Sequence, residues 1–218
     1  RCCSVEDIDD ARRVCQKIGV PHYVMNLERE FQEHVVDYFC QEYDRGRTPH
    51  PCLACNDKIK FDFLLKRALF LDADYIATGH YARVARTGEA YRLLKGLDAS
   101  KDQSYVLFTL GQAELSRLLL HIGEVDKADV RVMAAEAGLA VADKPDSQEI
   151  CFVPDGDYAS FVATQVPAVA RPGVIVDQRG NVLGSHGGVH RFTIGQRKGL
   201  GVSSHVPLYV LKIEAESG

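Results

Sequence analysis

The stretch Asp74-Tyr75-Ile76-Ala77-Thr78-Gly79-His80 decides the fold class of this chain. Its first five residues read as a short buried strand, and the glycine and histidine that follow mark the strand's end. In a parallel sheet, ligands collect at the carboxyl ends of the strands. The sequence therefore predicts that Gly79 and His80 lie at a binding site.

Helical and strand-like patterns alternate along the first part of the chain. Ser4 and Asp7 resemble a capping box, and apolar residues then recur at helical spacing until Gly19. Further segments are predicted as a strand (22–26), three helical regions (31–43, 59–71 and 103–139, the last in two pieces) and the strand quoted above. Such alternation favours an α/β fold with a parallel sheet that helices cover on both faces.

The composition changes beyond about Lys144. Short β-prone runs separated by turn signals predict strands at 174–176, 181–183, 191–194 and 208–211. We therefore expect a domain boundary near residue 147. Residues 1–147 would form the α/β domain, and residues 148–218 a small β-rich domain.

Bulk properties exclude several classes of protein. The 218 residues carry a formal net charge of −4, so a nucleic-acid partner would have to be bound by local basic patches. No apolar stretch approaches the length of a membrane span, and we expect a cytoplasmic protein. Seven cysteines without a secretory context predict mostly reduced thiols, with Cys15 and Cys40 as small buried apolar residues.

The remaining cysteines carry most of the functional information. Cys52 and Cys55 follow a loop braced by two prolines, and Cys151 lies far downstream. Thiols at fixed spacing indicate sulfur chemistry, redox chemistry or metal ligation. The spacing alone leaves these three open.

Five separated blocks, in the same order, resemble the MnmA/TrmU family of tRNA-specific 2-thiouridylases. They are Gly46–Pro51 with Cys55-Asn56 and Ile59-Lys60-Phe61; Ala77-Thr78-Gly79-His80-Tyr81; Lys101-Asp102-Gln103-Ser104-Tyr105; Asp146-Ser147 with Ile150-Cys151-Phe152; and Gln196-Arg197-Lys198-Gly199 within 195–201.

The resemblance implies an ATP pyrophosphatase-type domain that adenylates the 2-carbonyl of a wobble uridine. Cys151 would hold a persulfide, and Cys55 would be the nucleophile or resolving thiol, with a disulfide between them. Gly79 would contact ATP, which is expected with magnesium. The implied partners are a tRNA with a wobble uridine and a sulfur-donor protein, and the implied tRNA-contacting residues are His50, Pro51, Cys52, His80, Lys101, Asp102 and Gln103.

The sequence departs from this family in two ways. It has no serine- and glycine-rich run of the kind that cradles pyrophosphate, and it stops before the family's C-terminal β-barrel. We therefore expect a fragment that does not catalyse adenylation alone.

The second departure is Cys52, which stands where many relatives have aspartate. Cys52, Cys55 and Cys151 could hold three corners of a 4Fe–4S cluster that carries sulfide. The sequence is also compatible with a zinc or redox module that uses His50 and Cys151 in addition, and with a module that only binds tRNA.

Overall fold

The computed structural model describes residues 4–146, 150–153 and 156–217. Its contacts divide the chain into two compact units, Arg1–His34 with Cys52–Gln148 (unit 1) and Val35–Pro51 with Glu149–Gly218 (unit 2). The boundary predicted near residue 147 falls outside the described residues and stays a prediction. No sequence pattern indicates that residues 35–51 contact the C-terminal part of the chain.

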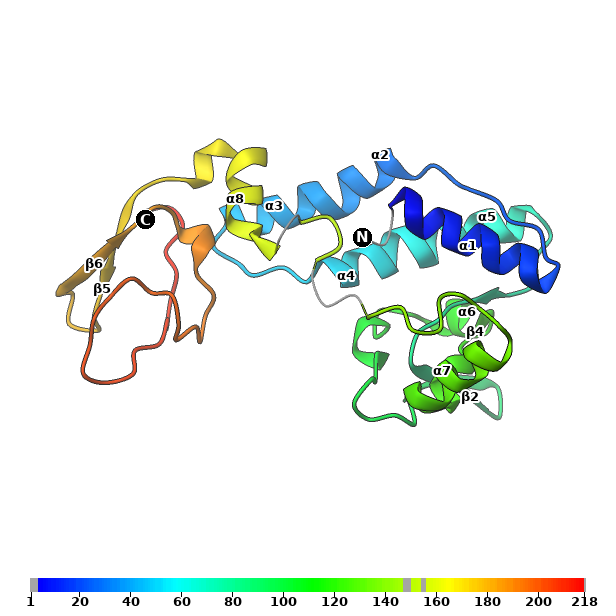
Figure 1. Ribbon diagram of the computed structural model, residues 1–218. Coiled ribbons are helices and arrows are strands. Elements are labelled where there is room, and N and C mark those ends of the chain that lie inside the picture. Colours follow the sequence, from blue (N-terminus) through cyan, green and yellow to red (C-terminus); the bar gives the residue numbers. More distant parts are fainter. Residues whose placement is uncertain (1–3, 147–149, 154–155, 218) are drawn as a thin grey trace. The chain divides into compact units, whose positions relative to one another are not determined.

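Unit 1 contains one short pair of parallel strands, and only the first of the two lies in a segment predicted as a strand, residues 74–78 (Figure 1). Strand β1 (Ile76–Ala77) pairs in parallel with β4 (Leu118–Leu119), and the Thr78 amide extends the ladder by donating to the Leu119 carbonyl over 3.2 Å. The core around this pair contains eight buried side chains: Phe61, Leu65, Ile76, Ala82, Val106, Leu107, Leu118 and Leu120.

The first helix of unit 1 begins and ends where the sequence predicts. Helix α1 (Val5–Ile18) is capped by the Ser4 side chain, which accepts from the Asp7 amide. Gly19 ends it with φ 74°, a conformation that glycine adopts without a steric penalty. The predicted helix near residue 130 is α7 (Lys127–Glu136).

Two predictions for unit 1 are wrong. Residues 22–26 form no strand, and Tyr23 is 83% exposed, because no described segment supplies the ladder that a strand needs. Leu118 and Leu119 form β4 instead of part of a helix, since pairing with β1 overrides their helical spacing. Short helices surround them: η3 (Ser104–Val106), α6 (Gln112–Leu115) and η4 (His121–Glu124).

A hairpin in unit 1 is absent from the sequence-based prediction. Strands β2 (Ala82–Thr87) and β3 (Ala90–Lys95) pair antiparallel across a two-residue turn at Gly88, which has φ 64°. Gly123 packs so closely on this hairpin that an added Cβ would lie 1.8 Å from the Ala82 carbonyl oxygen. The two-residue glycine turn is the sequence signal that could have indicated the hairpin.

Unit 2 combines helices with an antiparallel pair, β5 (Gly173–Val176) and β6 (Val182–His186), at two of the predicted positions. The predicted helix at 31–43 comprises α2 (Glu28–Phe31), the π-helix η1 (Gln32–Val36) and α3 (Asp37–Asp44). Its C-terminal half packs in unit 2 near α8 (Tyr158–Gln165), η6 (Pro167–Val169) and η7 (Val189–Arg191).

The strands predicted at 191–194 and 208–211 are wrong. Arg191 ends the short helix η7 (Val189–Arg191), and no strand is formed at either position. Among the described residues, Val210 accepts a backbone hydrogen bond from Gly195 (2.8 Å) and donates one to Gln196 (3.0 Å), just past the first predicted strand, and these two bonds are too few for a ladder. In the described part of the chain, no helix is long and apolar enough to cross a membrane.

Candidate active site

Cys52 and Cys55 lie inside one helical segment rather than in the loop before it. The segment begins with α4 (Pro51–Ala54) and continues through the π-helix η2 (Cys55–Leu64) into α5 (Leu65–Phe70). The predicted start at Ile59 is wrong, because Pro51 suits a first helical position, where its missing N–H is not needed. Cys52 is exposed, whereas Cys55 is half-buried.

The π-helix determines which side chains share a face with Cys55. Hydrogen bonds in a π-helix run from residue i to i+5, as the Leu65 amide shows by donating to the Lys60 carbonyl. Lys60 therefore lies one turn beyond Cys55. Such segments are rare and frequently occur at functional sites.

Asn56 fixes the start of the π-helix to the core. It is 3% exposed, and its Nδ2 donates to the Val106 carbonyl over 3.2 Å. Among the described residues, its Oδ1 has no hydrogen-bond partner. This single bond joins the Cys55 segment to η3, fifty positions away in sequence.

Gly79 stands at the carboxyl end of β1, where the sequence predicts a binding site. It is exposed, and a Cβ added to it would meet no atom within 4 Å apart from its two neighbours in the chain. The glycines at 96 and 123 differ, because an added Cβ there would strike backbone atoms of Tyr81 and Ala82. The open space beside Gly79 lets a ligand approach its backbone.

His80 is buried beside this glycine, and both of its ring nitrogens are engaged. Its Nδ1 lies 2.8 Å from Thr78 Oγ1, and its Nε2 lies 3.5 Å from Lys60 Nζ. Burial, followed by the charge of Lys60, lowers the pKa of His80 to about 4, so the ring is neutral near neutral pH. A direct contact between this ring and RNA would have to replace one of these partners, and the predicted tRNA contact stays a prediction.

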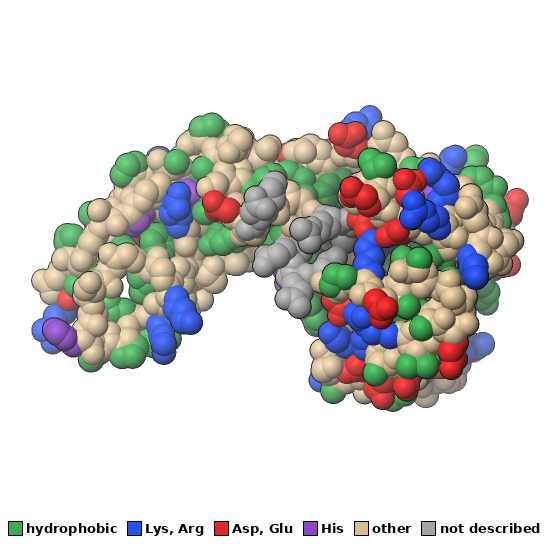
Figure 2. Space-filling view, in the orientation of Figure 1, with side chains coloured by type: hydrophobic (Ala, Val, Ile, Leu, Met, Phe, Trp, Pro, Cys, Tyr) green, Lys and Arg blue, Asp and Glu red, His purple; other side chains and the backbone are tan. Residues whose placement is uncertain are grey.

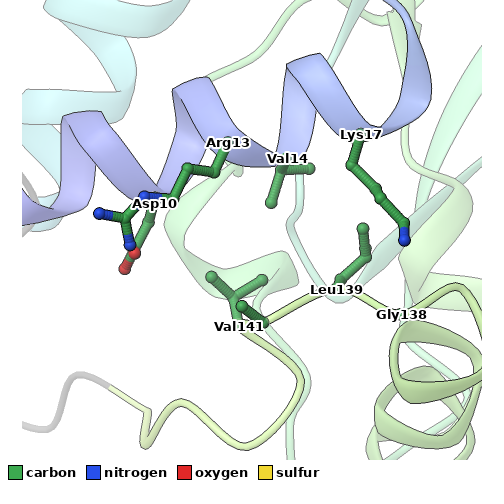
Figure 3. Close-up of a pocket in the computed structure, with 8 residues that line it drawn as sticks. Asp10, Arg13, Val14, Lys17, Gly138, Leu139 and Val141 are labelled. Atoms are coloured by element: carbon green, nitrogen blue, oxygen red, sulfur yellow. The ribbon is translucent and has the colours of Figure 1, made fainter.

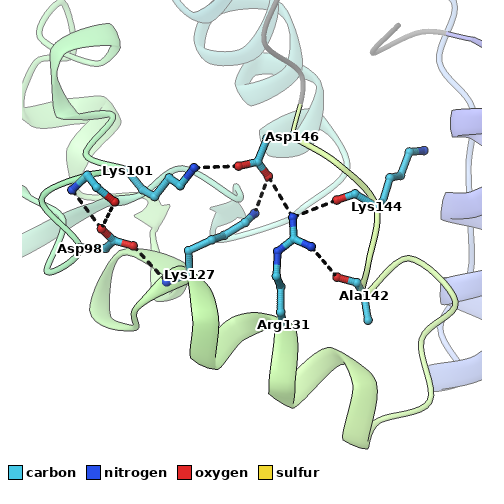
Figure 4. A network of polar contacts seen from close by, with 8 residues as sticks. Asp98, Lys101, Lys127, Arg131, Ala142, Lys144 and Asp146 are labelled. Carbon is cyan, nitrogen blue, oxygen red and sulfur yellow. Dashed lines mark hydrogen bonds and ion pairs between the residues drawn. The ribbon is translucent and has the colours of Figure 1, made fainter.

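Lys101 belongs to a cluster of charges on the surface of unit 1 (Figure 4). Its Nζ lies 2.9 Å from Asp146 Oδ2, while Lys127 and Arg131 approach Asp146 Oδ1 to 3.1 and 3.7 Å. Hydrogen bonds from Lys101 and Lys127 lower the pKa of Asp146. These three cations share Asp146, and Asp98 adds a second carboxylate nearby, so the cluster is only weakly positive.

Asp102 and Gln103 support the backbone near His80. Asp102 accepts from the Gly96 amide (2.9 Å) and the Ser104 hydroxyl (2.9 Å). Gln103 Oε1 accepts from the Tyr81 amide over 3.0 Å. These hydrogen bonds within unit 1 hold both side chains in place. The predicted contact of the two residues with tRNA stays a prediction.

Charges elsewhere on unit 1 are mixed rather than basic. Figure 2 shows Lys and Arg side chains interspersed with Asp and Glu over the region of α1 and α7. Lys144 is an example, because it pairs with Asp7 (2.5 Å) and Asp10 (2.7 Å) of α1. This distribution agrees with the small net charge and favours local contacts over a broad electrostatic surface.

In unit 2, Phe152, the residue after Cys151, packs against other aromatic side chains. The Phe152 ring lies 5.3 Å from that of Phe39, edge to face, and 5.5 Å from that of Phe161. These aromatic contacts set the backbone beside Cys151, which is half-buried. His50 is exposed and Pro51 is buried.

The proline-braced loop of unit 2 is held by contacts with the C-terminal segment. Thr48 Oγ1 lies 2.9 Å from Thr193 Oγ1, and Gly46, at φ 68°, packs against Ile213. Gln196 accepts from the Thr193 amide and donates to the Lys198 carbonyl, so it shapes its own turn. Arg197 and Lys198 are exposed.

Cys55 belongs to unit 1 and Cys151 to unit 2, and their pairing stays a prediction. Within the described ranges, no group of three or more His, Cys, Asp or Glu side chains could hold a metal ion, so the iron–sulfur and zinc alternatives have no structural support. Cys40 is buried as predicted, and burial, with a smaller effect of Asp37, raises the pKa of its thiol to about 11. Cys15 is only half-buried.

A pocket of about 180 Å³ lies away from the residues predicted to function (Figure 3). Val14 and Lys17 of α1 point toward the segment that contains Leu139 and Val141. Because neither Cys55 nor Gly79 lines it, this pocket is not the site that the sequence predicts.

Sequence reasoning assigns no specific role to several residues that the structure brings into the site. Asn56, Lys60 and Thr78 lie in the sequence segments that resemble the family, but the resemblance gives none of them a specific role. Lys127 and Arg131 are four residues apart in a predicted helix, a spacing that places them on one face and could have marked them as partners of a single carboxylate.

Two family descriptions match this chain. Residues 1–155 match the family described as tRNA methyl transferase HUP domain, and residues 159–218 match its PRC-barrel domain. These matches, with the parallel pair in unit 1, confirm the predicted fold class: an α/β nucleotide-hydrolase-like domain followed by a small β-rich one.

Curated relatives are identical to this chain at about half of the aligned positions. Relatives named tRNA-specific 2-thiouridylase MnmA come from Geobacter metallireducens (53% identical over 99% of this chain and 59% of the relative), Geotalea uraniireducens (54%, over 98% and 57%) and Carboxydothermus hydrogenoformans (52%, over 99% and 60%). The chain thus spans less than two thirds of these relatives. With its match over residues 1–155, the chain belongs to the tRNA methyl transferase HUP-domain family, in which the similar proteins are named tRNA-specific 2-thiouridylases.

Proposed function

We propose that this chain serves tRNA 2-thiolation: it presents the sulfur-transferring thiols and contacts both the nucleotide and the wobble uridine. The observation that carries the proposal is the end of β1, where Gly79 borders open space beside a polar chain that runs to the helix of Cys55. A strand end with an open glycine suits a nucleotide, and a nearby thiol suits attack on the activated base. The names of the relatives point to the same reaction.

The proposed sulfur path uses Cys151 and Cys55. A persulfide on Cys151 attacks C2 of the activated uridine with its terminal sulfur, and the activated oxygen leaves with AMP. The Cys55 thiolate then attacks Cys151 Sγ, the S–S bond to the base breaks, and 2-thiouridine is released with a Cys55–Cys151 disulfide left behind. An external thiol reductant would restore both cysteines.

ATP with magnesium is the proposed activating cosubstrate, and it would turn the uracil oxygen into a good leaving group. The open space beside Gly79 supports its binding there. His50, Pro51, Cys52, His80, Lys101, Asp102 and Gln103 are proposed to contact the tRNA. A protein that loads sulfur onto Cys151 is the second proposed partner, and a reducing compartment such as the cytoplasm fits chemistry that consumes thiols.

The first test is thiol mapping of the whole chain. Mild oxidation followed by peptide mass spectrometry is expected to yield a Cys55–Cys151 disulfide. In a separate reaction of the reduced chain, a polysulfide is expected to transfer one sulfane sulfur atom to the Cys151 thiolate and to leave as a polysulfide shorter by one sulfur. Cys151→Ser should abolish both products, whereas Cys15→Ser, a half-buried cysteine of α1, should abolish neither. Random pairing of all the cysteines would contradict the proposal.

A second test separates the nucleotide site from the thiols. Gly79→Ala places a methyl group in the open space, so it should weaken nucleotide binding without changing the disulfide yield. Anaerobic reconstitution with iron and sulfide, in the unaltered chain and in Cys52→Asp, tests the iron–sulfur alternative. A cluster spectrum that Cys52→Asp removes would favour that alternative over the persulfide path.

A further inference from the structure

Lys60 brings a positive charge to His80 from one turn beyond Cys55. Its Nζ lies 3.5 Å from His80 Nε2, at the outer limit of hydrogen bonding. A lysine ammonium group can only donate, so the nitrogen that faces it must present a lone pair. A proton on Nε2 would also point at a positive charge, which is unfavourable at this distance.

This arrangement determines where the imidazole carries its proton. His80 is 6% exposed and neutral near neutral pH, so the ring holds one proton. With Nε2 as the acceptor, that proton is on Nδ1 and is donated to Thr78 Oγ1 over 2.8 Å. Lys60 thereby selects one of two tautomers of a buried ring.

The choice of tautomer sets the role of the Thr78 hydroxyl. A hydroxyl can donate one hydrogen bond and accept others, and here an acceptor position is taken by His80. Its own proton is left to donate. Thr78 is half-buried, its amide is fixed to the Leu119 carbonyl, and it directly precedes Gly79 in the chain.

We propose that Lys60 is a positioning residue: it holds His80 as the Nδ1–H tautomer, which makes the Thr78 hydroxyl a donor to an oxygen of the ligand bound at Gly79. The ligand rests on the proposed function, and its acceptor is an oxygen without a proton. A phosphate oxygen of the nucleotide and the carbonyl oxygen of the uracil share this chemistry.

The tautomer is measured without any ligand. In the chain labelled with ¹⁵N-histidine, nitrogen NMR is expected to show His80 Nδ1 protonated and Nε2 unprotonated, with His80→Gln identifying the signals. Lys60→Met should introduce the Nε2–H form, Lys60→Arg should restore the original form, and Lys58→Met should change nothing, because Lys58 pairs with Asp57. An unchanged tautomer in a folded Lys60→Met chain would overturn the proposal.

The Thr78 hydroxyl is tested by binding of two separate probes, AMP and an anticodon stem–loop RNA with a wobble uridine. Thr78→Val should weaken one of them roughly tenfold, the size of one hydrogen bond, while Thr78→Ser binds normally. Lys60→Met should weaken the same probe, and the double variant should be no weaker than Thr78→Val. The affected probe identifies the oxygen as phosphate or carbonyl.

The two proposals fail in different ways. If Thr78→Val binds both probes as tightly as the unaltered chain, the role given to Thr78 and Lys60 is wrong while the proposed function stands. If the unaltered chain binds neither probe, the proposed function fails, and the ligand part of this inference fails with it. The tautomer measurement then still decides the role of Lys60 toward His80.

Discussion

Two buried histidines, one in each unit, have opposite surroundings. His80 has both ring nitrogens near polar side chains, and the glycine before it borders open space. His190 is completely buried, donates from Nδ1 to the Val169 carbonyl over 3.1 Å, and has no partner for Nε2 among the residues that the structure describes. Gly188 is pressed against its ring.

The difference separates the candidate binding site around His80 from the packed core around His190. Burial lowers the pKa of both rings, so neutrality alone does not distinguish them. What distinguishes His80 is the open space next to it and a charged partner that fixes its proton. A lysine near a buried histidine, with an open glycine between strand and ring, is the combination that indicates function here.

Gly188→Ala is expected to have the largest effect. An added Cβ would lie 2.5 Å from the His190 ring and 2.6 Å from the Val169 carbonyl oxygen, at a φ of 146° that other residues rarely adopt. Overpacking and backbone strain together should cost about 3 kcal/mol or more of unfolding free energy. Urea unfolding measures this loss, and a stability equal to that of the unaltered chain would show that the core around His190 is loose.

Acid should destabilise the fold through His80. The unfolded ring takes up its proton near pH 6.5, whereas the folded ring does so only at about 4. The contribution of His80 to the free energy of unfolding is therefore fully present above pH 6.5. It is lost as the pH falls toward 4, which lowers that free energy by roughly 3 kcal/mol. Urea unfolding at several pH values in this range should show that the free energy of unfolding falls more steeply with decreasing pH in the unaltered chain than in His80→Gln. Equal slopes would mean that His80 is not protected from protons.

Lys60→Met should raise the pKa of His80, but by less than the amount by which burial lowers it. Removing the ammonium group removes a repulsion, but burial is the larger cause of the low pKa, so the value should stay below 6.5. A histidine NMR titration measures it, with Lys58→Met as the matched control. A pKa that does not move would mean that Lys60 is too far away to influence the ring.

Gly79→Ala is expected to have the smallest effect on stability. Its methyl group would meet nothing within 4 Å, so the unfolding free energy should stay within about 0.5 kcal/mol. The comparison with Gly188→Ala uses the same chemical change beside each histidine. A large loss at Gly79 would place it in a packed environment and remove the argument for a ligand there.

The sequence predicts the local features of the fold better than its pairings. Helix α1 follows from a cap, an apolar stripe and a final glycine, all within one short segment. Strand β4 and the absence of a strand at 22–26 depend on partners far away in sequence, which apolar spacing does not report. For the same reason 208–211 reads as a strand but forms only two isolated bonds.

The site is predicted by residue type more than by arrangement. Gly79 at a strand end follows from the alternating pattern, and its open surroundings agree with a binding role. The chain from Lys60 through His80 to Thr78 could not be predicted, because it requires a helix and a strand end to meet side by side. Asn56 shows the same limit, since its partner is the distant carbonyl of Val106.

The π-helix that begins at Cys55 makes the site depend on how this segment winds. A helix with i→i+5 bonds contains a surplus residue relative to an α-helix, so deleting one residue between Cys55 and Lys60 could restore ordinary helical winding. Each residue of an α-helix advances its side chain by roughly 100°, so after that deletion the two groups, now four residues apart, would still share a face. If the segment instead wound as an α-helix at its full length, the five steps from Cys55 to Lys60 would turn the lysine roughly 140° away from the thiol. The π-helical winding is therefore what keeps the thiol and the lysine on one face at this spacing.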